Sequence, residues 1–275
     1  MDRYAVFGHP ISHSRSPDIH ARFAAQTRQT MEYRAMDVPA EVFETTLKTF
    51  IKDQGRGLNC TVPLKEIAFG VCDALSDRAQ RSGAVNTIKI AENGQLWGDN
   101  TDGVGLLRDL THNLSLTLKE KRILILGAGG ATRGIIEPLL EARPQSLWIA
   151  NRTIERAEQL ALDFKALGQI NAMGYMALEG FAFDLILNAT SASLSGALPP
   201  LPAGLLAPGG SCYDLAYGKE PTPFVHWGRE QGASLSADGI GMLVEQAAEA
   251  FHIWRGVFPE TRPVIEALAG GARTR

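Results

Sequence analysis

Cysteine, one-sided charge and long apolar runs are all scarce in this 275-residue sequence, and each scarcity excludes a class of protein. The three cysteines, Cys60, Cys72 and Cys212, are widely spaced and form no CxxC pair. This pattern argues against a disulfide framework or a zinc ribbon and favours a reducing compartment. No apolar run approaches the roughly 20 residues that cross a bilayer, and the N-terminus lacks the apolar core of a signal peptide. We therefore expect a cytoplasmic protein with no membrane partner.

Neither sign of charge dominates, because 27 lysines and arginines stand against 30 aspartates and glutamates, for a net charge of −3. Without a basic field, nucleic acid is a poor candidate partner. Hydrophobic residues at 45% and charged residues at 21% are typical of an ordinary globular protein. No metal site is predicted, because Pro10 excludes the helix that would place His9 and His13 on one face.

Glycine, by contrast, is plentiful with 28 residues, and it clusters in the segments GAGGA, GDNTDGVG and DGIG, where a backbone can approach a ligand closely. Short apolar runs alternate with amphipathic helical stretches, which is the pattern of an α/β protein with parallel sheets. Strands are expected at residues 4–7, 33–38, 58–62, 85–90 and 95–98, and then at 123–126, 147–150, 183–187, 211–215 and 233–235. The length allows one large or two medium domains.

The predicted fold is a two-domain α/β protein. Residues 1–102 form an N-terminal α/β substrate-binding domain, which is completed by C-terminal helices at about 240–270. Residues 103–239 form a doubly wound, Rossmann-type dinucleotide-binding domain, and the active site is expected in the cleft between the two domains.

A glycine loop follows the buried strand at 123–126 and opens a helix. It consists of Gly127, Ala128, Gly129, Gly130 and Ala131. The first glycine permits a tight turn, the second lets the backbone approach a pyrophosphate, and the helix N-terminus offers free N–H groups to that anion. A glycine pair can also be no more than a tight turn, but here strand, loop, helix and next strand are all in place. Thr132 occupies the third position of the G-x-G-x-x-G pattern and adds bulk to the packing between helix and strand.

The residues after the next strand indicate which dinucleotide is bound. Where an NAD site carries an acidic residue, this chain has Asn151, Arg152 and Thr153, with Arg156 one turn later. A guanidinium fork suits the 2′-phosphate of NADP, and the missing carboxylate removes a repulsion. As an alternative, Asn151 and Thr153 only cap the following helix, while the two arginines pair with Glu155 or Glu158. Capping and phosphate binding are compatible, so we predict NADP.

Four polar segments in the first half, residues 12–17, 59–65, 83–87 and 98–103, lie beside predicted strands, where open α/β sheets bind ligands. Together they offer hydroxyls, amides, one lysine and one aspartate, which suit a small polyhydroxylated acid. Their motifs are Ser14-Arg15-Ser16-Pro17, Asn59-Cys60-Thr61-Val62-Pro63-Leu64-Lys65, Gly83-Ala84-Val85-Asn86-Thr87 and Gly98-Asp99-Asn100-Thr101-Asp102-Gly103. With the glycine loop and Asn151-Arg152-Thr153, this ordered set resembles the shikimate dehydrogenase family from about residue 4 to residue 257. The departures are Cys60, where the family usually has valine, and Thr132, where it has a smaller residue.

The resemblance implies reversible reduction of 3-dehydroshikimate to shikimate with NADPH in aromatic amino acid biosynthesis, by a monomer or homodimer. It assigns the substrate carboxylate to Ser14 and Ser16, and the substrate hydroxyls to Thr61, Asn86 and Asp102. Lys65 is the implied general acid/base, with Asp102 beside it. Tyr217 and Gln246 are further implied substrate contacts, and Leu215 and Gly239 are implied to lie near the nicotinamide.

Elementary chemistry agrees with this assignment, because hydride delivery to a ketone develops an alkoxide that needs a proton donor and a nearby positive charge. Each residue also has a plainer interpretation: Ser16 before Pro17 is a helix N-cap, Lys65 is a solvated charge, and Asp102 is a cap. A regulatory relative would be expected to have lost Lys65 or Asp102. A one-carbon dehydrogenase fits less well, because the pair Ser14 and Ser16 suits a carboxylate. A quinate/shikimate dehydrogenase of broader specificity remains open.

Overall fold

A computed structural model of the protein describes residues 1–190 and 192–269. These residues form two compact units. The first unit contains Met1–Gly105 and Val244–Val264, and the second contains Leu106–Leu243 and the residues from Ile265 onward. The chain therefore changes unit within helix α5 (Asp102–Arg108) and again within helix α9 (Ile240–Arg255), both of which contain residues of each unit.

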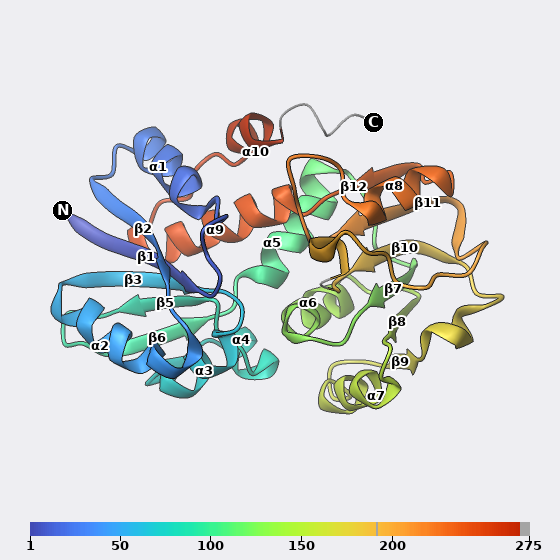
Figure 1. The fold of residues 1–275 in the computed structure, drawn as a ribbon, viewed down its shortest axis with the longest axis horizontal. Helices are drawn as coiled ribbons and strands as arrows, with labels where there is room; N and C mark the ends of the chain where they lie inside the picture. The colour runs from blue at the N-terminus through green and yellow to red at the C-terminus, as the bar shows by residue number, and fades with distance from the viewer. Residues whose placement is uncertain (191, 270–275) are drawn as a thin grey trace. The chain divides into compact units, whose positions relative to one another are not determined.

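The sheet of the first unit has the strand order β2-β1-β3-β5-β6-β4 (Figure 1). Its strands are β1 (Asp2–Gly8), β2 (Met31–Asp37), β3 (Gly55–Cys60), β4 (Ala74–Leu75), β5 (Thr87–Ile90) and β6 (Leu96–Asp99). β1 is parallel to β2 and β3, whereas β5 is antiparallel to both β3 and β6. The reversal is made by the hairpin turn between β5 and β6, in which Gly94 takes a φ of 84° that favours glycine.

Two sets of helices cover the two faces of this sheet (Figure 1). Helices α2 (Phe43–Lys52), α3 (Lys65–Val71) and α4 (Asp77–Ser82) bury their apolar side chains against one face, where Phe7 meets the rings of Phe43 and Phe50 edge-on. Alternation along β1 turns Tyr4 to the opposite face, which packs against α1 (Ser16–Thr27) and α9. The ring of Tyr4 lies 4.8 Å from that of Trp254.

A fully buried histidine lies within this second face. His20 of α1 stacks on Tyr33 with ring centroids 4.1 Å apart, beside Trp254. Among the described residues, neither ring nitrogen of His20 has a hydrogen-bond partner. Burial disfavours the protonated ring and lowers the pKa of His20 to about 3. The imidazole is therefore neutral in the folded protein at ordinary pH.

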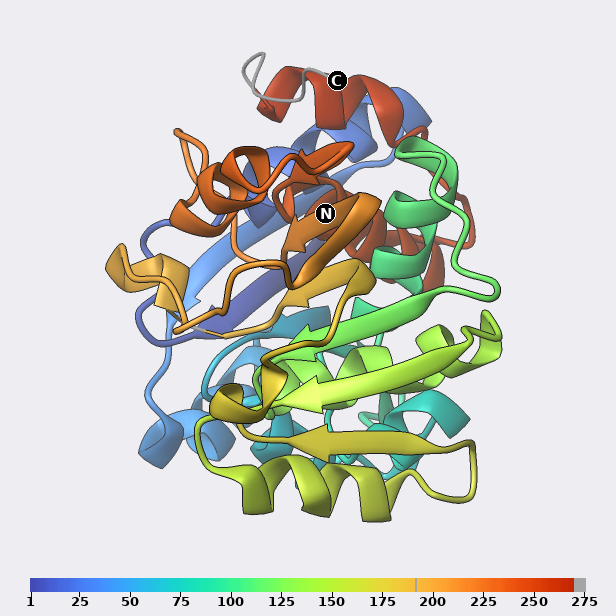
Figure 2. The same ribbon diagram turned by 90° about the vertical axis from the view of Figure 1, so that its right-hand side faces the viewer.

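The sheet of the second unit is wholly parallel and has the order β12-β11-β10-β7-β8-β9, which can be followed in Figure 2. Its strands are β7 (Arg122–Leu126), β8 (Ser146–Ala150), β9 (Ile170–Met173), β10 (Phe183–Asn188), β11 (Leu206–Asp214) and β12 (Leu235–Ala237). From β7 the chain first proceeds outward to β8 and β9, and then returns to β10 and continues the other way. The predicted two-domain α/β fold with a doubly wound second sheet is confirmed.

The helices of the second unit follow its strands. They are α6 (Gly130–Glu141), α7 (Ile154–Asp163) and α8 (Pro223–Glu230), with short 3₁₀ turns η3 (Tyr175–Leu178) and η4 (Ala192–Ser195). Helix α5 continues as a π-helical turn, η2 (Asp109–Asn113), and α10 (Arg262–Leu268) lies near the end of the described chain. A further 3₁₀ turn, η1 (Ala40–Val42), directly precedes α2. Every expected strand overlaps an observed one, while β4 and β9 were not predicted.

Candidate active site

Strand direction explains why the polar segments of the first unit gather at one edge of its sheet. β1, β3 and β6 all end at this edge, and β5, which runs the opposite way, begins there. The register places Asn59 opposite Thr87, and Thr87 opposite Asp99. Gly8 at the end of β1 lets the segment after β3 approach closely, since a Cβ on Gly8 would lie 2.4 Å from Cγ2 of Thr61.

Lys65 and Asp102 form a pair at this edge. Nζ of Lys65 lies 2.5 Å from Oδ2 of Asp102, and the two side chains are 19% and 10% exposed. Lys65 is the first residue of α3, and Asp102 is the first residue of α5. Neither side chain is a freely solvated charge, so the plainer interpretation of Lys65 is wrong. The pair keeps enough exposure for the ammonium group to exchange a proton with a bound molecule.

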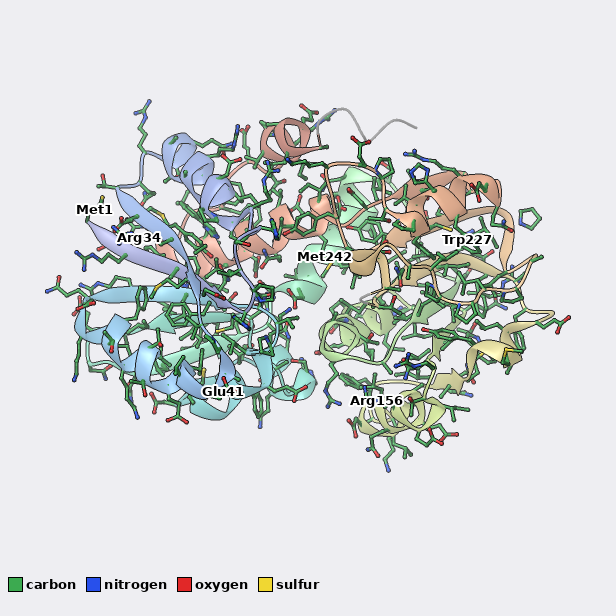
Figure 3. The ribbon with its side chains drawn as sticks, viewed as in Figure 1. Met1, Arg34, Glu41, Arg156, Trp227 and Met242 are labelled. Atoms are coloured by element: carbon green, nitrogen blue, oxygen red, sulfur yellow. The ribbon has the colours of Figure 1, made fainter. Side chains whose placement is uncertain are left out.

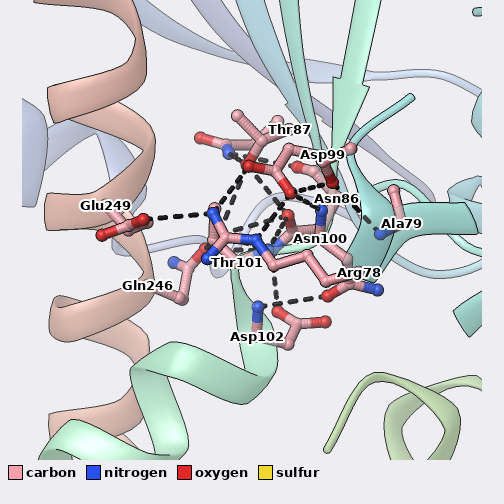
Figure 4. A network of polar contacts seen from close by, with 12 residues as sticks. Arg78, Ala79, Asn86, Thr87, Asp99, Asn100, Thr101, Asp102, Gln246 and Glu249 are labelled. Carbon is pink, nitrogen blue, oxygen red and sulfur yellow. Dashed lines mark hydrogen bonds and ion pairs between the residues drawn. The ribbon is translucent and has the colours of Figure 1, made fainter. Parts of the chain in front are cut away.

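The buried amide of Asn86 holds the other carboxylate oxygen of Asp102. The backbone N–H of Thr101 donates to Oδ1 of Asn86 at 2.8 Å. Because that N–H can only donate, the amide orientation is fixed and Nδ2 must face the other way. Nδ2 donates to Oδ1 of Asp102 at 2.8 Å and lies 3.3 Å from Oε1 of Gln246 on α9 (Figure 4). The structure thus brings Asn86, Asp102 and Gln246 together with Lys65.

An ion pair supports the segment that carries Asp102. The buried carboxylate of Asp99 accepts two hydrogen bonds from Arg78, at 2.7 and 2.6 Å, and one from the backbone N–H of Asn100 at 2.7 Å. Arg78 also contacts Glu249 on α9, as Figure 4 shows. Asn100 in turn accepts from the backbone N–H of Asp102 at 3.2 Å. Burial of a bidentate pair of this kind fixes the position of the turn after β6.

The two serines of the first polar segment lie at the start of α1. The backbone N–H of Ser16 donates to Oγ of Ser14 at 3.3 Å. The prediction that Ser16 is the N-cap is wrong, because Ser16 is already helical and Arg15 occupies the cap position without a side-chain bond. The side chain of Ser16 instead lies near the hydroxyl of Tyr33, which donates to Oδ1 of Asn59 at 2.6 Å. Burial raises the pKa of Tyr33 well above its usual value.

Tyr33 is a polar contact that no local pattern in the sequence marks, because a tyrosine on a strand most often only packs. Nδ2 of Asn59 donates to the carbonyl of Asn86 and to Oγ1 of Thr87, at 3.1 and 3.0 Å. Hydrogen bonds therefore connect Tyr33 through Asn59 and Thr87 to the amide beside Asp102. Thr61 is half-buried in the same segment as Asn59, and its backbone N–H donates to the carbonyl of Phe7 at 2.9 Å.

The glycine loop of the second unit has the backbone that a dinucleotide phosphate needs. Gly127 has a φ of 101°, and a Cβ on it would lie 3.2 Å from the carbonyl of Ala189. A Cβ on Gly129 or Gly130 would meet nothing within 4 Å, so the space in front of the N-terminus of α6 is open. Thr132 is fully buried, and its hydroxyl donates to the carbonyl of Gly127 at 2.8 Å. Its extra bulk thus closes the first helical turn onto the loop.

The segment after β8 presents two arginines to solvent. Arg152 and Arg156 are exposed, and within the described chain neither forms an ion pair with Glu155 or Glu158 (Figure 3 labels Arg156 on α7). Thr153 is the N-cap of α7 but makes no side-chain cap bond, so its predicted capping bond is wrong. Asn151 instead donates to the carbonyl of Thr153 at 2.8 Å, which fixes the turn. Two guanidinium groups without a carboxylate partner fit a phosphate group.

Further segments of the second unit meet on the other side of β7. Gly239 lies against Leu215, since a Cβ on Gly239 would be 2.2 Å from the carbonyl oxygen of Leu215. The backbone N–H of Gly239 donates to the carbonyl of Ala216 at 3.0 Å. Tyr217 is half-buried in the same segment. The structure therefore brings Leu215 and Gly239 together and places Tyr217 nearby in sequence, in the unit that holds the glycine loop.

A hydride can be delivered to a carbonyl group only if a proton donor compensates the charge that develops on its oxygen. The first unit supplies such a donor with its orienting carboxylate, and the second supplies a loop and cations suited to a dinucleotide. The fold and site are therefore those of a nicotinamide-dependent dehydrogenase with two α/β domains. Among the described residues, no group of three or more His, Cys, Asp and Glu side chains could hold a metal ion.

Comparison with known proteins identifies the dehydrogenase family to which this chain belongs. Residues 6–88 match the profile of the shikimate dehydrogenase substrate binding domain, and residues 109–195 match that of the shikimate / quinate 5-dehydrogenases. Residues 239–269 match the shikimate 5′-dehydrogenase C-terminal domain. The chain belongs to the shikimate dehydrogenase family, and this confirms the resemblance inferred from its motifs.

Individual relatives are similar over almost their whole length. The shikimate dehydrogenase (NADP(+)) of Methylococcus capsulatus is 63% identical over 99% of this chain and 98% of its own, and that of Alkalilimnicola ehrlichii is 55% identical over 97% and 98%. Among solved structures, an Ael1 enzyme from Pseudomonas putida superposes with a TM-score of 0.91 at 48% identity, covering 98% of each chain. Shikimate 5-dehydrogenase from Thermus thermophilus, solved with NADP(H) and shikimate, has a TM-score of 0.87 at 37% identity over 97% of this chain and 98% of its own.

Proposed function

We propose that this protein catalyses the reversible, NADP-dependent reduction of 3-dehydroshikimate to shikimate, a step in the biosynthesis of aromatic amino acids. One observation carries the proposal beyond family membership: Lys65 and Asp102 form a part-buried pair 2.5 Å apart. A relative that had kept the fold for a regulatory role would have no need of this pair. Its burial also costs desolvation energy that a non-catalytic protein could avoid with apolar residues.

Lys65 is the proposed general acid/base. When bound, NADPH supplies the hydride for the ketone carbon of the substrate. The ammonium group of Lys65 donates a proton to the oxygen that becomes the new hydroxyl, and in the oxidation direction the amine takes that proton back. Asp102 holds the ammonium group through Oδ2. Asn86 occupies Oδ1 of the same carboxylate and so prevents it from rotating away from the lysine.

The remaining polar side chains of the first unit are proposed to bind the substrate. Ser14 and Ser16 lie at the N-terminus of α1, where backbone N–H groups and the helix dipole favour the carboxylate of shikimate. The proposed contacts to the ring hydroxyls are Thr61, Asn86, Asp102, Tyr217 and Gln246. The shared contact of Asn86 with Asp102 and Gln246 supports this grouping for three of the five.

The cofactor residues are proposed from the second unit. Gly127, Ala128, Gly129, Gly130 and Ala131 are proposed to bind the pyrophosphate, because the space before the N-terminus of α6 is open. Asn151, Arg152, Thr153 and Arg156 are proposed to bind the adenosine 2′-phosphate, which the two unpaired guanidinium groups fit. Leu215 and Gly239 are proposed to lie beside the nicotinamide ring. In this assignment the first unit is the substrate-binding domain and the second the NADP-binding domain.

For the setting of the reaction, we infer the cytoplasm and a monomeric or homodimeric state. The three cysteines are free thiols, as expected in a reducing compartment. Within the described chain, no helix is long and apolar enough to cross a bilayer. Sedimentation analysis of the purified protein distinguishes the two oligomeric states.

The decisive experiment mixes the purified protein with one substrate, shikimate or quinate, and one cofactor, NADP or NAD. The absorbance of the reduced nicotinamide is then followed for each of the four pairs. The expected result is rapid reduction of NADP with shikimate and a much smaller kcat/KM for the other three pairs. Lys65→Met provides the matched control, because it keeps the length of the side chain and removes the charge. A wild-type protein that binds NADP and shikimate without turnover would refute the proposal. A higher kcat/KM for quinate than for shikimate would show that quinate, and not shikimate, is the preferred substrate.

A further inference from the structure

Asp214, the last residue of β11, is a fully buried carboxylate that the proposed chemistry does not use. Nδ2 of Asn188 and the backbone N–H of Ala216 donate to its Oδ1, each at 3.1 Å. The hydroxyls of Ser193 and Thr222 donate to its Oδ2, each at 2.6 Å. Within the described part of the chain, no lysine, arginine or histidine forms an ion pair with it. Burial accordingly raises the pKa of Asp214.

The four donors come from three separate segments. Asn188 ends β10, and its Oδ1 accepts from the backbone N–H and the hydroxyl of Thr190, at 3.2 and 2.7 Å. Ser193 lies a few residues further on, in η4. Ala216 belongs to the segment after β11, and Thr222 is the N-cap of α8. One carboxylate thus holds the residues that follow β10, the residues that follow β11 and the start of a helix.

One of these segments adjoins the glycine loop, and another contacts Gly239, which is proposed to lie beside the nicotinamide. β10 is the neighbour of β7, and a Cβ on Gly127 would lie 3.1 Å from Cγ2 of Thr190. The carbonyl of Ala216 accepts from the backbone N–H of Gly239. In a doubly wound sheet a dinucleotide lies across the point where the strand order reverses, here β7. Arg152 and Arg156, which follow β8, are proposed to bind the adenosine half of the cofactor. The segments held by Asp214 follow β10 and β11, on the opposite side of β7, and therefore lie on the nicotinamide side.

We propose that Asp214 is a positioning residue, which fixes the segments after β10 and β11 so that the nicotinamide half of the cofactor finds its site already formed. The proposal rests on the proposed NADP-dependent function. A buried carboxylate without a cation is costly, and capping α8 alone would need only the threonine hydroxyl. The four hydrogen bonds offset that cost, and in doing so they couple the strand ends to each other.

Two single substitutions separate positioning from stability. Ser193→Ala and Thr222→Ala each remove one hydroxyl that donates to the same oxygen of Asp214 at the same distance. Only Ser193 belongs to a segment beside the glycine loop, whereas Thr222 also caps α8 by accepting from the backbone N–H of Val225. Ser193→Ala should raise the dissociation constant for NADP roughly three- to tenfold, the equivalent of one lost hydrogen bond. Thr222→Ala should lower Tm more than Ser193→Ala does and leave NADP binding within about twofold of wild type.

A double-mutant cycle shows whether Ser193 acts through Asp214. Asp214→Asn keeps the shape of the side chain and removes its charge, and it should weaken NADP binding at least as much as Ser193→Ala. If the serine acts through the carboxylate, the combined variant should bind NADP no more weakly than Asp214→Asn alone. Additive losses would mean that Ser193 touches the cofactor directly and would overturn the proposal. The Michaelis constant for shikimate at saturating NADP should stay unchanged in Ser193→Ala and Thr222→Ala, neither of which alters the segment that carries Tyr217.

Calorimetric titration of the wild type with NADP separates the two levels of inference. No binding by the wild type would overturn the proposed function, and the role of Asp214 with it. Binding by the wild type with equal affinities for Ser193→Ala and Thr222→Ala would overturn the role of Asp214 alone. Hydrogen exchange adds a readout that is independent of the cofactor, because Ser193→Ala should speed exchange at the backbone N–H of Thr190.

Discussion

Replacing Lys65 by methionine tests the proposed chemistry most directly, because it removes one proton donor and leaves the apolar stem in place. Loss of a general acid/base costs roughly 10²–10⁴ in kcat, which is about 2.7–5.4 kcal/mol of transition-state stabilisation. The carboxylate of Asp102, whose side chain is 10% exposed, contacts Lys65 and Asn86. The same change removes the ammonium group and leaves it the amide of Asn86. Breaking a buried pair costs 3–5 kcal/mol, and the partial exposure of both groups places the expected loss of stability at about 3 kcal/mol.

A second variant separates the two losses. Lys65→Met combined with Asp102→Asn removes the unpaired carboxylate, so it should regain much of the free energy of unfolding while its activity stays as low as that of Lys65→Met. Stopped-flow or steady-state absorbance at the nicotinamide band gives kcat, and urea denaturation gives stability. If Lys65→Met binds NADP and shikimate normally and keeps a kcat within a few-fold of wild type, the lysine is not the proton donor and the mechanism is wrong.

Three further predictions concern the cofactor, the substrate anchor and pH. Arg152→Ala should raise KM for NADP at least tenfold and leave KM for NAD nearly unchanged, because a charge-assisted phosphate contact contributes about 1.5–3 kcal/mol and NAD lacks the 2′-phosphate; equal losses in the kinetics of both cofactors would show a purely structural arginine. Ser14→Ala and Ser16→Ala should each raise KM for shikimate more than they lower kcat, since a carboxylate contact persists into the transition state, and a lower kcat at unchanged KM would count against anchoring. His20→Leu should reduce the acid sensitivity of folding, because the unfolded ring takes up a proton below pH ~6.5 while the buried ring, with a pKa of about 3, does not. The unfolding free energy of the wild type therefore falls by up to about 1.4 kcal/mol per pH unit between those values; denaturation at pH 7 and pH 5 should show a smaller fall for His20→Leu than for the exposed control His226→Leu, and identical falls would contradict the argument.

Features with a local signal could be predicted from the sequence. The apolar run Ile123–Leu126 followed by glycines marks a buried strand that opens into a helix, and the structure has both. The turn at Asn93-Gly94 marks the hairpin between β5 and β6. Because strand ends carry ligand sites in α/β sheets, the polar segments could also be named before their geometry was known.

Features that depend on distant contacts could not be predicted. The amide orientation of Asn86 is set by the backbone N–H of Thr101, and the role of Asp99 depends on Arg78 from another helix. The expected cap at Ser16 failed because α1 already includes that residue and Arg15 takes the cap position. The contact of Tyr33 with Asn59 on another strand likewise has no local signal. The start of α8 did have a local signal in Thr222-Pro223, a capping residue before a proline, which the hydrophobic pattern alone did not reveal.

The discontinuity of the first unit has a consequence for how the protein is made. Tyr4 packs against Trp254, whose indole N–H donates to the carbonyl of Ile88 at 3.0 Å, so β1 and β5 need a helix from near the other end of the chain. A ribosome adds about 5–20 residues per second, and the first sheet must therefore wait on the order of 10–30 seconds with one apolar face uncovered. The sheet of the second unit lies within the continuous stretch from Leu106 to Leu243 and is complete at β12, before α9 is made. The dinucleotide-binding unit should thus be folded before the substrate-binding unit, although the latter emerges first, and nascent chains cut short of α9 should aggregate through the uncovered face.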